Sequence, residues 1–379
     1  MKTAPSKPKA QNASPPIQAQ TVSDWETNIP YIRSLLERDI YGAIPSLGDI
    51  TIVERKTVNA LALDGKANVE EITLSVAPQI NGEITNPRTF RYVLVSPNAA
   101  KDAVPVIMME TFCPNHRTLF FEGISKPDGA YFDCSDSGLM GSIFRYFFGR
   151  YITSPPIEMI INRGYAVATT YSSEFIPDNA KRARPILNDY GTNTAAIGLW
   201  AYQFSAMAKV LEADPRINAS ITYGHSRFGK SALVAAAYDT QIDAVIAHQS
   251  GTGGASLTRN KPGETRKAIT ESYPHWFTQA YSQSDPELDQ HHLLALIAPR
   301  PLMLGNAKRD VWSDPEGAFR AAKAANSIYR LYDSYGLSAD KLTHFKPSDD
   351  IAFWMRPGTH GVVKEDWPAF LAFLDAHFK

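Results

Sequence analysis

Ser226 lies between a short apolar run, residues 217–224, and an Ala-rich run that begins at Lys230. This pattern predicts a strand, a sharp turn and a helix, an arrangement that presents a serine hydroxyl at the end of a sheet beside backbone N–H groups that favour negative charge. A serine placed in this way can act as the nucleophile of an α/β-hydrolase. The usual G-x-S-x-G pattern is altered, because Gly224 is followed by Gly229 and the bulky Phe228 stands where a small residue is normal.

The same stretch also fits a phosphate-binding P-loop. Gly224, Gly229, Lys230 and Ser231 match G-x-x-x-x-G-K-S, and strand-then-helix is the correct context for that motif too. A P-loop ATPase also needs an apolar strand ending in Asp to hold magnesium, whereas a hydrolase needs an acid and then a histidine downstream. The sequence favours the second arrangement, and magnesium-dependent ATP binding would support the first.

The acid and the histidine are predicted from the segments that follow. Asp310 comes after an apolar run, and His360 stands in a loop before the C-terminal helix. Catalytic groups of open α/β sheets gather at the carboxyl ends of strands, and Ser, Asp, His is the α/β-hydrolase order. Asp314 is the nearest substitute for Asp310, although Asp-Pro fits a turn or helix start better. His291 and His292 are adjacent and are interpreted as structural.

Composition excludes several classes of protein. The 379 residues carry a net charge of −1, so the chain lacks the excess of basic residues that would indicate nucleic acid binding. Cys113 and Cys134 could pair or stay reduced, and their spacing does not suggest zinc. No metal and no organic cofactor is expected. There is no apolar run of the kind that a secretory signal or a membrane span needs.

Hydrophobic patterning predicts a disordered leader over residues 1–22 and one catalytic domain over 23–379. A capped helix is expected from residue 23, followed by an antiparallel start to the sheet and then by doubly buried strands that alternate with helices. The predicted fold is α/β, an α/β-hydrolase with three layers and a mixed, mainly parallel central sheet. The expected strands are 50–58, 69–77, 90–97, 104–110, 164–172, 220–224 and 242–251, and residues 300–315 are expected to form a further strand that runs into a loop. The expected helices after residue 100 are 154–164, 192–214, 230–239, 316–336 and 367–378.

Over residues 90–375 the chain resembles the glucuronoyl esterases of carbohydrate esterase family 15. The resemblance rests on TFCPNH, NRGYAVATTYSSEFIPD, GHSRFGKSAL, SGTGGASL, RDVWSDP and MRPGTH, which occur in the family's order. It explains the displaced glycine, because the family signature is G-x-S-R-x-G-K. It implies a Ser-His-acid mechanism in which Ser226 attacks the ester and His360 transfers the proton.

The resemblance also implies roles for neighbouring residues. Many members have a glutamate where this chain has Gln249; a neutral amide cannot stabilise an imidazolium, so the acid role is assigned to Asp310. Arg227 is expected to stabilise the oxyanion. Lys230, Glu264 and Trp312 match positions that contact the uronate, and Gln249 is placed with them as substrate-binding.

The resulting prediction is a serine esterase that cleaves the ester between 4-O-methyl-glucuronate on glucuronoxylan and an alcohol such as a lignin hydroxyl. The alternatives are an acetyl xylan esterase or another acyl hydrolase on the same fold, and a carbohydrate-binding protein that has lost efficient catalysis. We expect a monomer that binds neither nucleic acid nor membranes. A plant-wall substrate implies a secreted or periplasmic protein, an inference from function alone.

Overall fold

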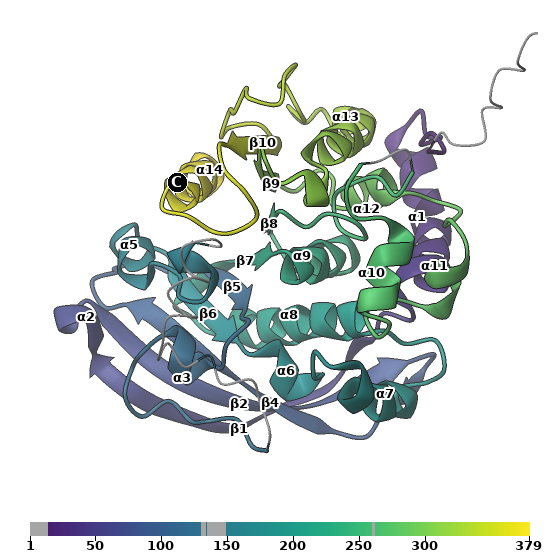
Figure 1. The fold of residues 1–379 in the computed structure, drawn as a ribbon. Helices are drawn as coiled ribbons and strands as arrows, with labels where there is room; N and C mark the ends of the chain where they lie inside the picture. The colour runs from purple at the N-terminus through teal and green to yellow at the C-terminus, as the bar shows by residue number, and fades with distance from the viewer. Residues whose placement is uncertain (1–13, 130–133, 135–148, 260–261) are drawn as a thin grey trace, which may run out of the picture.

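A ten-stranded mixed sheet runs through the molecule in a computed structural model, which describes residues 14–129, 134, 149–259 and 262–379. The strand order is β1-β2-β4-β6-β5-β7-β8-β9-β10, with β3 paired to β2 (Figure 1). Pairs from β6 to β10 are parallel, and the pairs among β1, β2, β3, β4 and β6 are antiparallel. The strands are β1 (Ser46–Leu61), β2 (Ala67–Ile80), β3 (Glu83–Ile84), β4 (Arg88–Pro97), β5 (Val104–Glu110), β6 (Ala166–Thr170), β7 (Ile217–His225), β8 (Ala244–His248), β9 (Leu302–Ala307) and β10 (Ile351–Arg356).

The central strands are apolar along both faces because helices cover both faces. In β5, Val106 and Met108 pack into one apolar core, while the alternating Ile107 and Met109 pack into the other. This is the two-residue period of a strand expressed in a sheet with two buried sides. The predicted α/β-hydrolase fold, with a mixed and mainly parallel sheet, is confirmed.

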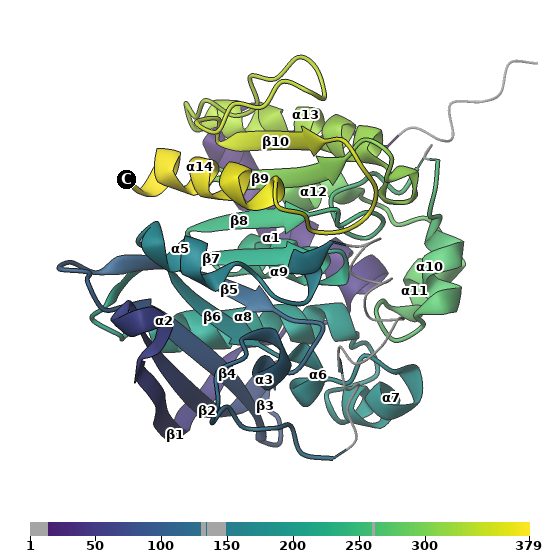
Figure 2. The same cartoon turned by 60° about the vertical axis from the view of Figure 1, so that its left-hand side comes forward.

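The two helical layers differ in size. Figure 2 shows α5 and α14 on one face of the sheet, with α1, α8 and α9 behind it, and the membership of the two cores agrees. The helices are α1 (Val22–Leu36), α2 (Ala62–Gly65), α3 (Asn115–Thr118), α5 (Ile157–Asn162), α6 (Ser172–Phe175), α7 (Ala180–Asp189), α8 (Ala196–Glu212), α9 (Arg227–Tyr238), α10 (Arg266–Ser272), α11 (Gln279–Gln283), α12 (Gln290–Ala295), α13 (Pro315–Leu331) and α14 (Asp366–Phe378), with a π-helical turn η1 (Glu37–Tyr41) and 3₁₀ turns η2 (Arg150–Ile152) and η3 (Val311–Ser313). Within the described ranges, every helix falls short of the length and apolarity that a bilayer crossing requires.

The N-terminal segment joins the fold earlier than expected. Residues 1–13 of the predicted leader lie outside the described residues. Ser14 donates a hydrogen bond of 2.6 Å to Asp289, and the carbonyl of Pro15 lies 2.7 Å from Nε2 of His291. Helix α1 begins at Val22, where Thr21 and Asp24 form a reciprocal capping box. Contacts with the core therefore precede the predicted boundary at residue 23.

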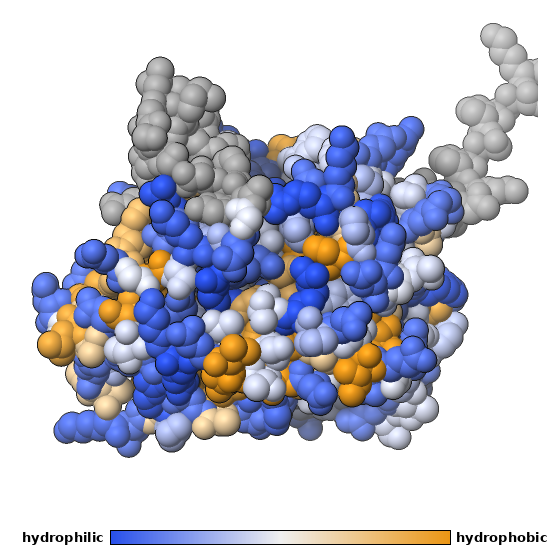
Figure 3. All heavy atoms as spheres, turned by 90° about the horizontal axis from the view of Figure 1, so that it is seen from below, coloured by the Kyte–Doolittle hydropathy of each residue, from blue (hydrophilic) through white to orange (hydrophobic). Residues whose placement is uncertain are grey.

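The outer strand β1 forms an edge of the sheet. Most of its side chains are exposed, and Glu54, Arg55 and Lys56 follow one another along it, as is common where an unpaired edge must not recruit another strand. Figure 3 views the molecule from the side of β1 and β2, and its apolar side chains form small separate groups on a hydrophilic surface. The described residues of this face show no broad apolar area of the kind that marks many subunit interfaces. The monomeric state stays a prediction.

Two strands, the two-residue β3 and the longer β10, are absent from the expectations. Residues 351–356 form β10, which pairs with β9 in parallel and ends directly before the loop that carries His360. The apolar run IAFWM was a usable signal, but the loop prediction for MRPGTHG covered its end. β10 places His360 after the carboxyl end of a parallel strand, as β9 does for Asp310.

Candidate active site

Ser226 occupies the turn between β7 and α9 in a conformation rare for a residue with a side chain. Its φ is 57° and its ψ is −121°. Two backbone hydrogen bonds hold the turn: the Ser226 N–H donates to His248 O at 2.8 Å, and the Gly229 N–H donates to Ser226 O at 3.0 Å. Strained backbone of this kind persists only where surrounding contacts impose it, and here it projects the serine from the strand end.

Two glycines allow the strand and helix to approach so closely. A Cβ on Gly224 would stand 1.9 Å from Phe228 O, and a Cβ on Gly229 would stand 3.0 Å from Gly224 O. In the usual G-x-S-x-G pattern, the second glycine would stand at position 228. Here Gly229 provides the close approach of strand and helix in its place. Phe228 is accommodated because its ring turns into the core, 5.6 Å from the ring of Trp200.

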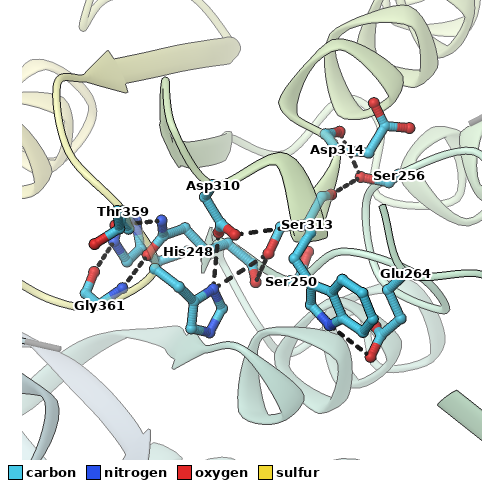
Figure 4. A network of polar contacts seen from close by, with 12 residues as sticks. His248, Ser250, Ser256, Glu264, Asp310, Ser313, Asp314, Thr359 and Gly361 are labelled. Carbon is cyan, nitrogen blue, oxygen red and sulfur yellow. Dashed lines mark hydrogen bonds and ion pairs between the residues drawn. The ribbon is translucent and has the colours of Figure 1, made fainter. Parts of the chain in front are cut away.

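Asp310 and His360 meet at the adjacent strand ends. His360 Nδ1 lies 2.8 Å from Asp310 Oδ2 and 3.2 Å from the Ser313 hydroxyl (Figure 4). Burial opposes ionisation of Asp310, but the hydrogen bond and charge of His360 and the hydrogen bonds from Ser313 outweigh it and lower its pKa below the usual range. Asp310 therefore presents a carboxylate to Nδ1, which leaves Nε2 as the imidazole nitrogen for proton transfer.

Asp314 is engaged elsewhere. Its carboxylate accepts the Gly317 N–H at 2.9 Å and caps the start of α13, as the Asp-Pro pair suggested. It is not a substitute acid in this geometry.

Gln249 forms hydrogen bonds with the loop that carries His360. Its Oε1 accepts the Gly361 N–H at 2.8 Å, and its Nε2 donates to Thr359 O at 3.2 Å, so the amide bonds the backbone on both sides of the histidine. The residue is 1% exposed. An amide suits this position because one end must donate and the other accept. The structure thus places Gln249 against the loop that carries His360, and its predicted contact with substrate stays a prediction.

Arg227 is the first residue of α9, so its backbone N–H has no acceptor within the helix. Such an N–H beside the nucleophile is a natural oxyanion donor. Its side chain forms an ion pair with Asp178, in the segment between α6 and α7. The sequence analysis did not single out Asp178, since 49 positions separate it from its partner.

The three residues assigned to the uronate lie at different depths. Lys230 is 3% exposed, and its ammonium donates to the carbonyls of Ser250 and Thr252, the latter at 2.8 Å. Its ammonium therefore holds the loop formed by residues 250–254 from the buried side. Trp312 is 57% exposed, and its indole N–H donates to Glu264 at 3.0 Å, so these two form a hydrogen-bonded pair near the surface.

These contacts also remove the P-loop alternative. The lysine that would meet phosphates is buried against loop carbonyls, and the Ser231 hydroxyl that would meet magnesium pairs with Glu110. Within residues 14–129, 134, 149–259 and 262–379, no group of three or more His, Cys, Asp and Glu side chains is arranged to hold a metal ion.

His225 was not predicted, although it precedes the nucleophile. Its ring lies 4.6 Å from that of His360 and 5.2 Å from that of His248, measured between centroids. Neither ring nitrogen has a hydrogen-bond partner in the described part of the chain. Burial, followed by the charges of His360 and His248, holds its pKa well below the usual range, so His225 packs as a neutral ring against the proposed base.

Glu110 is a second group that sequence reasoning missed. It ends β5 beneath α9, fully buried, and burial raises its pKa well above the ordinary 4.5. Burial in the folded protein therefore disfavours the charged form of Glu110, whereas the unfolded chain ionises above about pH 4.5.

We expect Glu110→Gln to become more stable relative to wild type as pH rises. The raised pKa contributes stability that is complete below the unfolded pKa and is lost as pH increases toward the folded pKa, and glutamine does not titrate. Thermal unfolding from pH 4 to pH 8, with the exposed Glu122→Gln as control, measures the difference. If the free energy of unfolding of Glu110→Gln fell relative to that of wild type as pH increased, this assignment would be wrong.

Cys113 and Cys134 form a disulfide, which settles the alternative that the sequence left open. Cys113 lies directly after β5, next to Phe112, whose ring is 6.1 Å from that of His225. The bridge thus ties the loop after β5 to a residue 21 positions on.

A serine at a strained strand-to-helix turn, followed by an aspartate and a histidine at later parallel strand ends, defines an α/β-hydrolase. A family model described as glucuronyl esterase, fungi, matches residues 152–333. Carbohydrate esterase MZ0003, from an unknown prokaryotic organism, is 31% identical over 377 residues, covering 91% of this chain and 83% of that protein. The structure of a promiscuous esterase of carbohydrate esterase family 15 from a marine bacterial metagenome superposes with a TM-score of 0.82 at 29% identity, covering 98% of both chains.

The chain belongs to carbohydrate esterase family 15, the glucuronoyl esterases, and is a carboxylic ester hydrolase. A fungal relative, 4-O-methyl-glucuronoyl methylesterase 1 of Wolfiporia cocos, is 27% identical over 187 residues, which are 44% of this chain and 46% of that enzyme. The chain therefore matches about half the length of that enzyme.

Proposed function

We propose that the protein hydrolyses the ester between 4-O-methyl-glucuronate on glucuronoxylan and an alcohol, with Ser226, His360 and Asp310 as its catalytic residues. The observation that carries this proposal is the 2.8 Å contact between His360 Nδ1 and the buried Asp310 carboxylate, at strand ends beside the Ser226 turn. The name of the fungal relative supports the choice of substrate.

In the proposed reaction, Ser226 Oγ attacks the ester carbonyl while His360 Nε2 takes the hydroxyl proton. Asp310 stabilises the imidazolium through Nδ1–H, and the Arg227 backbone N–H and side chain stabilise the oxyanion. The intermediate then breaks the bond to the alcohol oxygen, which receives the proton from His360. Water, deprotonated by His360, releases the glucuronate carboxylate and restores Ser226.

Glu264 and Trp312, the pair near the surface, would recognise the uronate. Glu264 can accept hydrogen bonds from ring hydroxyls, and the exposed Trp312 offers an apolar face to the sugar. Lys230 would act indirectly, because its ammonium fixes the carbonyls of Ser250 and Thr252.

We also propose that the protein works in a secreted or periplasmic setting. A disulfide between Cys113 and Cys134 supports this, since such bonds persist in oxidising compartments. The alcohol released would be a lignin hydroxyl or a smaller alcohol.

The test compares benzyl glucuronate, an acetylated xylose and 4-nitrophenyl acetate as substrates. We expect kcat/KM to be highest for the glucuronate ester. Preference for the acetylated sugar would retain the esterase mechanism and replace the substrate, whereas binding of glucuronate without turnover of any ester would indicate a carbohydrate-binding protein.

A further inference from the structure

The Arg227 guanidinium is enclosed by a carboxylate and three aromatic rings. Asp178 pairs with Nη1, and the ring centroids of Trp276, Tyr273 and Phe112 lie 4.7, 5.3 and 5.4 Å from Cζ. The Tyr273 and Trp276 rings are stacked, with centroids 3.7 Å apart and planes 3° apart. A cation held among rings is shielded from water, which strengthens its interaction with a charge that develops nearby.

Asp178 is itself held by two further groups. Its Oδ1 accepts the Trp276 indole N–H at 2.7 Å and lies 3.1 Å from His275 Nε2. Burial raises its pKa, but the His275 hydrogen bond, the Arg227 charge and the Trp276 hydrogen bond together lower it below the usual range. A charged and immobile carboxylate therefore faces Arg227.

The place of this cluster in the fold suggests what it positions. β5 lies beside β7 in parallel, and Phe112 belongs to the loop that leaves β5. In α/β-hydrolases, the loop after the strand that neighbours the nucleophile strand contributes to the oxyanion hole. The Arg227 side chain, on the residue that follows Ser226, reaches that loop, since its Cζ lies 5.4 Å from the centroid of the Phe112 ring.

We propose that Asp178, fixed by His275 and Trp276, is a positioning residue that holds the Arg227 guanidinium at the oxyanion. This inference rests on the proposed function, in which Ser226 generates that oxyanion. A free arginine must give up rotamer entropy to adopt one conformation. The ion pair and the ring stack fix the side chain before substrate arrives, so the transition state gains an oriented donor without that loss.

The test is a double-mutant cycle with Asp178→Asn, Arg227→Met and the double variant. We expect Asp178→Asn to lower kcat by about tenfold to a hundredfold, less than full loss of an oxyanion donor, with little change in KM. In the Arg227→Met background the same change should have almost no further effect, because the group it positions is gone. Equal effects of Asp178→Asn in both backgrounds, or an unchanged kcat, would overturn the proposal.

Asp214→Asn is the matched control. Asp214 is buried and pairs with Arg216 at 2.7 Å and Arg55 at 3.0 Å, just before β7 and thus at the opposite end of that strand from Ser226. It should lower the unfolding temperature and leave kcat unchanged. If Asp178→Asn does not fold, Trp276→Phe replaces it in the cycle, since it keeps a ring and removes one donor to Asp178.

Both benzyl glucuronate and 4-nitrophenyl acetate are used throughout. If wild type cleaves only the acetate, the proposed substrate is wrong, yet the coupling between Asp178 and Arg227 is still measured. If the glucuronate ester is cleaved and the effects are additive, the proposed function stands and the positioning role fails.

Discussion

Ser226→Ala should lower the turnover of benzyl glucuronate by about a millionfold, because alanine has no oxygen to form the acyl bond. The backbone around residue 226 would still supply oxyanion donors, so about a thousandfold acceleration over water should persist. The strained φ of 57° is compatible with alanine only at some cost, so thermal unfolding of the variant should be measured beside its kinetics.

The control for this experiment is Ser327→Ala, which changes an exposed serine on α13 whose hydroxyl bonds only the local carbonyl of Ala324, at 2.9 Å. Its turnover should match wild type. Hydrolysis that persists undiminished in a folded Ser226→Ala protein would exclude Ser226 as the nucleophile and with it the acyl-enzyme mechanism.

Asp310→Asn should lower turnover by about ten-thousandfold while leaving the shape of the site intact. An asparagine amide can donate to His360 Nδ1, which favours the tautomer with its proton on Nε2. That nitrogen could then no longer accept the Ser226 proton, and no carboxylate would stabilise the imidazolium.

Gln249→Ala provides the comparison for Asp310→Asn. It removes the hydrogen bonds to Thr359 and Gly361 but keeps the carboxylate on His360, so about a tenfold loss is expected, in line with one or two lost hydrogen bonds. Steady-state kinetics of both variants, with thermal unfolding as a check on folding, decide the ranking. A larger loss in Gln249→Ala than in Asp310→Asn would overturn the assignment of the acid.

The central strands and the Ser226 turn between β7 and α9 could be predicted from the sequence because both depend on local patterns. Doubly apolar runs such as residues 104–110 form strands buried on two faces, and the Ser226 motif is a strand, turn and helix within 23 residues. The displaced Gly229 could also be rationalised from family resemblance, and its Cβ contact supplies the steric reason. β10 was missed because its apolar run, IAFWM, is short and leads directly into Arg356, Pro357 and Gly358, which indicated a loop.

Contacts between distant segments could not be predicted from such patterns. Nothing local indicates that Asp178 meets Arg227, or that the Gln249 amide spans residues 359 and 361. Lys230 is a case in which a local pattern suggested a contact different from the one in the structure. A lysine after a glycine suggests a ligand-facing charge, yet the turn of α9 directs its ammonium under the Ser250 loop, where backbone carbonyls satisfy it.

The bond between Cys113 and Cys134 bears on how the protein should be produced. A chain made in a reducing cytosol would have to assemble the loop after β5 without this crosslink, and that loop contributes Phe112 to the Arg227 surroundings. Closing a loop of about 20 residues is worth about 3 kcal/mol in the chain-entropy view, a large share of the stability of a typical domain. Export to an oxidising compartment, or oxidative refolding, is therefore part of preparing material whose kinetics represent the native enzyme.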